Sequence, residues 1–561
     1  MTRWVRALWL AIGAAVLLRL FLLAWLPLTD PAEGRYGEIG RKMAELGDWI
    51  TPWHQYGVPF WGKPPLSFWM TALSLKGLGI NEFAARLPHF LAGVATAACL
   101  WNVARARAAH EGVIAAGVLG TALLFFLSSG AVMTDAGLVL GTTLATTGVW
   151  LALSSEDPVQ RRRQAWLAFV GGALGILAKG PLALVLVGTP LLLWAAWCGR
   201  WRALWEALPW VRGVVLMVAL SAPWFFAAEW KTPGFFEYFF VGEHYHRFAT
   251  PGWAGDLYGK AHQEPKGMIW VFAAGACMPW TVVLPALALW RWWRARGGAG
   301  VGAETVAAAD GASAPAVQAS SQRGSPSMGL PPSSHGPWAL SERETARFIR
   351  LCALVPLVFF TASSNIIWTY VLPAMPGLAW WAARWLGRLR EQGLRWASAG
   401  VWLAVLAWTA LAFITQANGR LERSSAKGLV AACDAAWARH APGVDATMKS
   451  SAGQAADHRD DAAAPATAGD GATQGAARLV LLGRRSFSAH FYTQGRALRV
   501  DHLHEAQTQW PASGTCLAVK QDDPASLAAA RDGAQLVEDL GVHHERQLWW
   551  ALRLPGLKDK R

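Results

Sequence analysis

Three carboxylates stand beside apolar runs of the sequence, where a charged group is costly unless it has a role. Asp30 and Glu33 follow the first apolar run in TDPAEGRYGEI, and Asp135 precedes another run in MTDAG. Such a carboxylate could orient or deprotonate an acceptor molecule. Asp30, Pro31 and Glu33 also match a capping box at a helix start. Thr134 or Asp135 could likewise cap the next helix, so catalytic and structural roles both stay open.

Three cations occupy comparable positions. Lys63 precedes a Pro pair, Lys179 ends an apolar run before Gly-Pro, and Arg247 belongs to the sequence EHYHRF. An ammonium or guanidinium group at such a place can hold a phosphate. The alternative for the two Lys residues is to extend the ammonium to the membrane interface, the more frequent role of a lone Lys. Together with the carboxylates and His244, these cations would balance a neutral sugar carried on a lipid phosphate.

The spacing of Glu243, His244 and His246 invites comparison with a metal site. Zinc sites usually add a ligand from a distant part of the chain to such a close group. No distant ligand stands out, so we assign no metal ligands, and a divalent metal cofactor stays an open alternative.

The chain that positions these residues has the composition of a membrane protein. Of its 561 residues, 53% are hydrophobic, only 16% are charged, and 35 are Trp, a residue typical of membrane–water interfaces. The net charge of +14 comes without a zinc or nucleic-acid motif, so we expect no nucleic-acid partner. Candidate spans are 5–28, 84–104, 112–129, 132–153, 165–178, 181–198, 211–229, 268–290, 348–363, 367–386 and 396–415. The pair within 165–198 could also be one bent element.

The basic residues orient these spans. With the N-terminus in the cytoplasm, the inner segments contain RAR, RRR, RWR, RWWRAR and RWLGRLR, as the positive-inside rule requires. The first run lacks a cleavage site and is predicted to be an uncleaved span. The outer loops 29–83 and 229–267, with the outer helix ends, then carry the polar residues named above. Helical spacing of Tyr36, Ile39, Met43 and Leu46 predicts an amphipathic helix at the membrane surface, ended by Gly47.

Two domains follow from this pattern. Residues 1–415 form the transmembrane domain, with a low-complexity cytoplasmic loop at 297–340, and residues 416–561 form a small periplasmic α/β domain with a similar insertion at 445–476. We predict a helix at 428–439 and strands at 478–482 and 516–519. Cys433 and Cys516 could pair if this domain is periplasmic, which the sequence does not decide. The predicted fold class is a membrane all-α bundle of about eleven spans with periplasmic juxtamembrane helices and a C-terminal α/β domain.

Seven motifs follow one another along residues 1–415. They are AEGRYGEIGRKMAELGDWITP, GKPPLSFWMTAL, NEFAARLP, MTD, AKGP, EHYHRF and TYVLPAMP. This order resembles the aminoarabinose (4-amino-4-deoxy-L-arabinose) transferases, which share the GT-C membrane fold of the protein O-mannosyltransferase-like proteins. The stretch from RYGEI to NEFAARLP is the specific part, while the C-terminal domain fits more loosely through SFSAHFYTQGRALRV.

The resemblance implies an integral-membrane transferase that takes a sugar from undecaprenyl phosphate in the periplasm. It also implies which residues lie around the lipid phosphate, with Asp135 as the acidic residue of the second loop. Carried over by position, the phosphate-binding residues would be Arg35, Tyr36, Lys63, Lys179, Arg247 and Tyr370.

The sequence departs from the family pattern at three places. The family usually has Asp-Glu where this chain has Ala32-Glu33, so Asp30 or Glu33 must serve as the first acidic residue. A Glu-Lys-Pro motif is replaced by Gly-Lys63-Pro, which removes one carboxylate available to a metal. A Lys before TYVLP is replaced by Ser363-Ser364-Asn365-Ile366. These changes suggest a relative with a different sugar or acceptor.

We therefore expect a bacterial inner-membrane glycosyltransferase. It would move 4-amino-4-deoxy-L-arabinose or a related sugar from undecaprenyl phosphate to lipid A, another lipid or another envelope glycan. Glu33, Asp30 and Asp135 are the catalytic candidates, and His244 joins the substrate-binding residues. The alternative is a transporter or flippase of polyprenyl-linked sugars, which would need charges at mid-bilayer or paired repeats. A third alternative is an envelope scaffold acting through the C-terminal domain.

Overall fold

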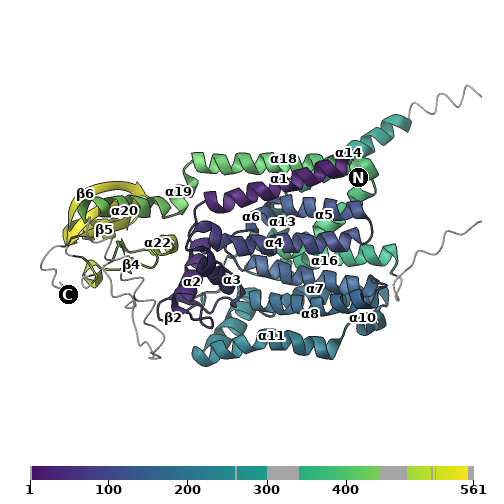
Figure 1. Ribbon diagram of the computed structural model, residues 1–561, viewed down its shortest axis with the longest axis horizontal. Helices are drawn as coiled ribbons and strands as arrows, with labels where there is room; N and C mark the ends of the chain where they lie inside the picture. Colours follow the sequence, from purple (N-terminus) through teal and green to yellow (C-terminus); the bar gives the residue numbers. More distant parts are fainter. Residues whose placement is uncertain are drawn as a thin grey trace, which may run out of the picture.

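The computed structural model describes residues 3–259, 262–299, 340–441, 477–506, 509–511 and 513–553. Helices run along the long axis of the molecule, with a small α/β domain at one end and the N-terminus at the other (Figure 1). The predicted insertion at 445–476 and nearly all of the predicted loop at 297–340 lie outside the described residues. The expected all-α membrane fold with a C-terminal α/β region is confirmed.

Every predicted apolar run lies on one helix or on a consecutive pair of elements. Six of the described helices are long and apolar enough to cross a membrane, or seven if α13 and α14, bent by 82°, count as one span. The count of eleven spans therefore stays a prediction, and 165–198 forms two helices. The bundle elements are α1 (Arg3–Trp25), α4 (Glu82–Arg105), α5 (Ala109–Thr121), α6 (Leu123–Ser128), α7 (Asp135–Ser154), α8 (Pro158–Lys179), α9 (Leu182–Cys198), α10 (Trp201–Ala207), α11 (Trp210–Lys231), α13 (Met268–Ala276), α14 (Trp280–Ala299), α16 (Glu342–Ala362), η2 (Trp368–Ala374), α17 (Met375–Gly387) and α18 (Arg390–Ala417).

Helices α7 and α8 approach each other closely because small residues line their contact. A Cβ on Gly141 of α7 would lie only 2.5 Å from the backbone N of Gly175 on α8. Small residues allow such close backbone approach in membrane helices. The contact holds the N-terminal end of α7, which begins at Asp135, beside the C-terminal end of α8, which finishes at Lys179.

A layer of short elements, called the outer layer below, covers the end of the bundle that faces the α/β domain. It consists of α2 (Ala32–Leu46), a hairpin of β1 (Trp53–Gln55) and β2 (Val58–Pro59), α3 (Leu66–Leu78), the π-helix η1 (Glu237–His246) and α12 (Arg247–Ala249). Figure 1 shows α2 and β2 at this end, next to the domain.

Helix α2 confirms one prediction and corrects two. Gly47 ends it in a left-handed conformation, as expected. The capping box was wrong: Pro31 occupies the N-cap position, and no side chain caps the helix. The polar side of the amphipathic helix is also buried, since Glu38 and Arg41 are almost fully covered. The physical reason is that the C-terminal domain packs on α2 through α22.

The C-terminal domain holds a five-stranded sheet with the order β4-β3-β5-β7-β6. Strands β3, β4 and β5 are parallel, and β7 pairs antiparallel with β5 and β6. Alternate residues of β3 face opposite sides, so α20 covers one face while η3 and α23 cover the other. The elements are α19 (Arg420–Ser424), α20 (Lys427–His440), β3 (Leu479–Leu482), α22 (Phe487–Tyr492), β4 (Ala497–Val500), η3 (Leu503–Ala506), β5 (Thr515–Lys520), α23 (Pro524–Gly533), β6 (Ala534–His543) and β7 (Arg546–Arg553).

This domain matches the elements predicted for it. The predicted helix corresponds to α20, and the two predicted strands correspond to β3 and β5. A disulfide joins Cys433 of α20 to Cys516 of β5, which resolves the pairing that the sequence left open.

Candidate functional site

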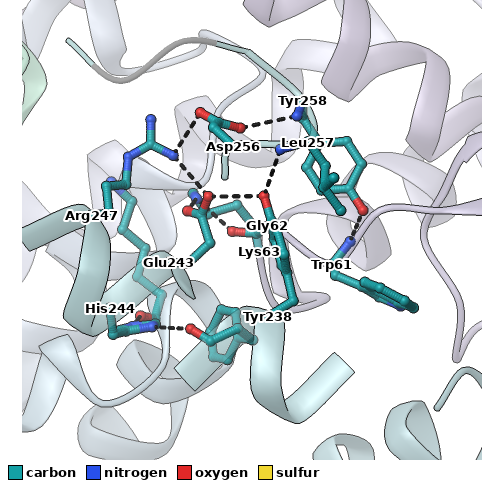
Figure 2. A network of polar contacts seen from close by, with 12 residues as sticks. Trp61, Gly62, Lys63, Tyr238, Glu243, His244, Arg247, Asp256, Leu257 and Tyr258 are labelled. Atoms are coloured by element: carbon teal, nitrogen blue, oxygen red, sulfur yellow. Dashed lines mark hydrogen bonds and ion pairs between the residues drawn. The ribbon is translucent and has the colours of Figure 1, made fainter. Parts of the chain in front are cut away.

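A buried carboxylate joins two cations from distant parts of the chain. Lys63 Nζ lies 2.7 Å from Glu243 Oε2, and Arg247 Nη1 lies 2.8 Å from Glu243 Oε1 (Figure 2). Arg247 also contacts Asp256 Oδ2 at 3.1 Å. The Glu243 side chain is 4% exposed, while Lys63 and Arg247 are 23% and 20% exposed. The buried carboxylate therefore fixes both cations, and each cation keeps part of its side chain accessible to a ligand.

The charges around Glu243 keep it ionised. Burial opposes ionisation, but the nearby charges of Lys63 and Arg247 outweigh it and lower the pKa of Glu243. Burial also acts against the charged form of Arg247, yet the carboxylates beside it raise its pKa above the ordinary value. Glu243 and Arg247 consequently stay charged throughout the neutral range.

The backbone around Lys63 is held by a tyrosine from the second outer loop. The Tyr258 hydroxyl accepts a hydrogen bond from Trp61 N at 3.0 Å (Figure 2). It donates one to the carbonyl of Pro59 at 2.9 Å. Burial raises the pKa of Tyr258 to about 12, so the phenol stays protonated and can keep donating. The Pro pair after Lys63 then starts α3. The ammonium group thus stands on a rigid turn.

The π-helix η1 presents Glu243 on its last turn, and Arg247 begins α12 directly after it. The Nδ2 group of Asn365 donates to the carbonyl of Arg247 at 2.7 Å, which ties this segment to the start of η2. Segments of π-helix are rare and often occur at functional sites.

A second ion pair joins the N-terminal end of α7 to the C-terminal end of α8. Lys179 Nζ is 2.7 Å from Asp135 Oδ1, and both side chains are nearly buried. The ammonium also lies 5.5 Å from the ring centroid of Tyr370. Tyr370, on η2, therefore lies against the ammonium side of this ion pair.

His244 connects the ion pair of Glu243 to that of Lys179 through the backbone. Its Nδ1 lies 2.7 Å from the carbonyl of Phe239, and its Nε2 lies 3.1 Å from the carbonyl of Lys179. Burial lowers the pKa of His244 despite these carbonyl contacts. Gly180 is required here because its φ is +69°, and a Cβ would lie 2.7 Å from the Phe239 ring and 3.2 Å from His244 Nε2.

Arg35 differs from the other cations because no carboxylate partner holds it among the described residues. Its guanidinium donates to the carbonyl of Tyr258 and lies over the rings of Tyr36 and Phe60, and its Nε is buried without a hydrogen-bond partner in that part of the chain. Tyr36 packs against Phe60 and Phe68. Arg35 therefore has hydrogen-bonding capacity left for an anion.

Glu33 is held by Arg86 in a bidentate ion pair. Arg86 Nε and Nη2 each lie 2.7 Å from a Glu33 oxygen, and the remaining contacts to Glu33 come from the backbone N–H groups of Thr29 and Val132. Arg86 also donates to carbonyls at the end of α1. This pair links α1, α2 and α4 at the base of the outer layer.

Asp30 is bound by the C-terminal domain. Its carboxylate accepts hydrogen bonds from the Ser486 hydroxyl at 2.7 Å and from Ser488 N and Oγ at 2.8 and 2.9 Å. Asp30 and Glu33 therefore have different surroundings, although they are only three residues apart.

No group of three His, Cys, Asp or Glu side chains within the described ranges is arranged to hold a metal ion. Glu243 is occupied by two cations, and both ring nitrogens of His244 face carbonyl groups. The metal alternative for the EHYHRF motif therefore has no geometric support in these residues.

Sequence reasoning located most of the cations but missed several of the groups that hold them. Glu243 is the common partner of Lys63 and Arg247, and its spacing of four residues before Arg247 was the available signal. Asp256, Tyr258 and Arg86 had no comparable signal, because their roles depend on contacts between distant segments.

The chain is similar in sequence to known membrane glycosyltransferases. Residues 14–239 match the family model described as dolichyl-phosphate-mannose-protein mannosyltransferase. The undecaprenyl phosphate-alpha-4-amino-4-deoxy-L-arabinose arabinosyl transferase 1 of Pseudomonas fluorescens is 27% identical over 68% of this chain and 58% of its own length. The corresponding transferase of Yersinia pestis is 30% identical over 51% of each chain. The chain thus spans only about half to three fifths of the length of these curated relatives.

The fold agreement extends over almost the whole molecule. The crystal structure of ArnT from Cupriavidus metallidurans bound to undecaprenyl phosphate matches with a TM-score of 0.67 and 17% identity, covering 98% of this chain and 99% of that one. The apo structure of the same protein matches with a TM-score of 0.64. These findings confirm the predicted resemblance and the GT-C fold.

Proposed function

We propose that this relative of the aminoarabinose transferases is an integral-membrane glycosyltransferase that uses a sugar linked to undecaprenyl phosphate. The observation that carries the proposal is the arrangement of four cations at one end of the bundle. Lys63, Arg247 and Lys179 are each anchored by a carboxylate, whereas Arg35 has no carboxylate partner among the residues that the structure describes. Counting Glu243, Asp256 and Asp135 against them leaves a net positive charge, which suits a lipid phosphate.

Cations at this place stabilise the leaving group of a glycosyl transfer. The bond between the anomeric carbon and the phosphate oxygen breaks, its electron pair stays on that oxygen, and an acceptor oxygen forms the new bond to carbon. The phosphate gains one negative charge in this step. Preorganised cations in a partly buried site lower the free energy of the charge as it develops.

Asp135 is the carboxylate that we propose as the base when the acceptor is a hydroxyl group. It lies beside Lys179 and Tyr370, among the groups assigned to the phosphate. Both oxygens of Glu33 are engaged by Arg86, and Asp30 is bound by the C-terminal domain, so we assign these two to positioning. If the acceptor is a phosphate oxygen, no proton has to be removed.

An apolar cavity suits the hydrocarbon part of the donor. It has a volume of about 550 Å³ and is lined by α5, α13, α14, α16 and α17, with Trp270, Leu357, Met375 and Leu378 among its walls. Met375 directly follows η2, which carries Tyr370. We propose that the polyprenyl chain enters this cavity while its phosphate lies at the cations.

The proposed location is the bacterial inner membrane, with the C-terminal domain in the periplasm. The N-terminus and helix α10, which begins within the predicted inner motif RWR, lie at the end of the molecule opposite this domain (Figure 1). A disulfide in the domain also fits an oxidising compartment. The proposed sugar is 4-amino-4-deoxy-L-arabinose or a related one, the sugar printed in the names of the relatives. The proposed acceptor is lipid A or another envelope glycan, as expected from the sequence.

The test compares the envelope lipids and glycans of cells with and without this gene by mass spectrometry. We expect one species to lose the mass of one sugar in the deletion, to be restored by the wild-type gene and not by Lys63→Ala. Lys231→Ala is the matched control, because Lys231 pairs with Asp48 away from the cation cluster. Carrier-linked sugar that accumulates inside the cell, with no product mass changed, would contradict the transferase and favour a flippase.

A further inference from the structure

The carboxylate of Asp30 lies in a pocket of donors that belongs entirely to the C-terminal domain. Besides the two serines, His544 Nε2 lies 3.3 Å from Asp30 Oδ2, and Arg546 interacts with Asp30 electrostatically. Burial disfavours the ionised carboxylate, but the hydrogen bonds from His544, Ser486 and Ser488 lower the pKa of Asp30 overall. Asp30 is thus a charged contact between the first outer loop and a domain more than four hundred residues later.

The serines come from a defined place in the sheet. Strand β3 ends at Leu482, and its parallel neighbours β4 and β5 lie on opposite sides of it. The chain after β3 therefore leaves the sheet at the point where strand order reverses, which is the usual ligand-binding crevice of such sheets. Ser486 and Ser488 stand in this connection, and a side chain of the membrane domain occupies their donors.

Phe487, between the two serines, reaches the proposed phosphate site. Its ring centroid lies 6.0 Å from the guanidinium carbon of Arg35 and 5.3 Å from the ring of His54. Burial and the charge of Arg35 lower the pKa of His54 to about 3, so this ring is neutral and adds no competing charge. The residues that hold Asp30 are therefore continuous with one that packs on Arg35.

The fit around Asp30 is tight. A Cβ on Gly34 would lie 2.5 Å from Asp30 Oδ1 and 2.9 Å from the backbone N of Ser488. Any side chain at position 34 must push the two segments apart. Gly34 is also the residue before Arg35, so the contact and the phosphate ligand are adjacent on α2.

We propose that the C-terminal domain positions Arg35 for the donor phosphate, with Asp30, Ser486 and Ser488 as the positioning residues and Phe487 as the wall against the guanidinium. This assignment deepens the proposed function and rests on it, because it takes Arg35 to be a phosphate ligand. The domain is then a part of the active site and not only an attached module.

The test measures the affinity of the purified full-length protein for undecaprenyl phosphate in nanodiscs, together with the turnover at saturating donor. We expect Asp30→Asn and Gly34→Ala to weaken binding about tenfold, because a charge-assisted contact is lost or displaced. Turnover at saturating donor should stay close to the wild-type value, and each variant is measured below its own melting temperature, so that only folded protein is compared. Glu82→Gln is the matched control, since Glu82 makes another contact to the C-terminal domain, through Tyr492 and Lys427.

A double-mutant cycle separates positioning from general docking. In an Arg35→Ala background, Asp30→Asn should weaken binding no further, because its effect acts through Arg35. Additive effects, an unchanged affinity of Asp30→Asn, or an equal loss in Glu82→Gln would overturn the assignment while leaving the proposed function intact. If the wild-type protein itself binds no undecaprenyl phosphate, the proposed function fails and the assignment fails with it.

Discussion

At the scale of single residues, the site relies on cations that already have carboxylate partners. Lys63 and Arg247 share Glu243, and Lys179 pairs with Asp135. Each ammonium has three donors and each guanidinium has five, so one carboxylate leaves donors for a phosphate. Placing cations in a partly buried site without such partners would be costly. The carboxylates therefore make a cationic site possible close to hydrocarbon.

Glu243→Gln should remove a pH-dependent part of the stability. The pKa of Glu243 is lower in the folded protein than its ordinary value of about 4.3, so the ionised side chain stabilises the fold above that pH. This contribution is lost as the pH falls through the lowered pKa. Thermal melting between about pH 3 and pH 7 should show the wild type more stable than Glu243→Gln at neutral pH, with the difference shrinking in acid. A constant difference would contradict this assignment.

Residue patterns singled out the cations of the proposed site more readily than the carboxylates that hold them. Lys63, Lys179 and Arg247 stand out because a charge beside an apolar run is rare. The partner of a charge is harder to predict, because it is set by contacts between segments far apart in the sequence. Asp30 illustrates this point: its local pattern fits a helix cap, yet its carboxylate is bound by serines of another domain.

At the scale of elements, the pair of Glu33 and Arg86 holds the outer layer to the bundle. Glu33 belongs to α2 and Arg86 to α4, and Arg86 also satisfies carbonyl groups at the end of α1. A bidentate pair fixes both distance and direction between these helices. Since α2 carries Arg35 and Tyr36, the pair sets where these two side chains lie.

Glu33→Gln should therefore destabilise the protein by about 3 to 5 kcal/mol, because Arg86 would keep its charge in a buried place without a carboxylate. Thermal unfolding in detergent measures the effect. Glu206→Gln is the control, because its pairing with Arg202 is exposed and should contribute less than about 1 kcal/mol. Unchanged stability of Glu33→Gln combined with loss of transfer would instead make Glu33 the catalytic base.

The apolar cavity gives a second prediction at this scale. Ala274→Trp would place a large ring in the cavity and should reduce the affinity for undecaprenyl phosphate by about tenfold, while a short-chain prenyl phosphate binds as before. Ala219→Trp on α11 is the control, because residue 219 is exposed and does not line this cavity. Equal binding of the long and short chains by both variants would exclude the cavity as the polyprenyl site.

The helices of the bundle could be predicted from the sequence because a long apolar run is by itself enough to indicate a membrane-spanning helix. The short elements of the outer layer were harder to predict. The π-helix η1 and the buried polar side of α2 depend on packing between this layer and the C-terminal domain. A pattern of polar residues on one helix face does not say whether water or another domain covers that face.

At the scale of the whole molecule, the disulfide links the two halves of the C-terminal domain. Cys433 and Cys516 are 83 residues apart and join α20 to the sheet. Replacing both with Ala should lower the free energy of unfolding of this domain by about 2 to 5 kcal/mol. Hydrogen exchange of β3 and β5 reports the change, and Cys99→Ala in α4 serves as the control. Unaltered protection of these strands would show that the bond contributes little.

The contact between Asp30 and Ser488 spans 458 residues of sequence. During synthesis, Asp30 and Arg35 emerge more than four hundred residues before the serines that hold Asp30. A chain that stopped before residue 486 could insert all its apolar helices and would still lack the serines that hold Asp30 beside α2. The phosphate site would then be complete only once the C-terminal domain has folded against α2. Until that point, the protein would bind lipid-linked sugars more weakly.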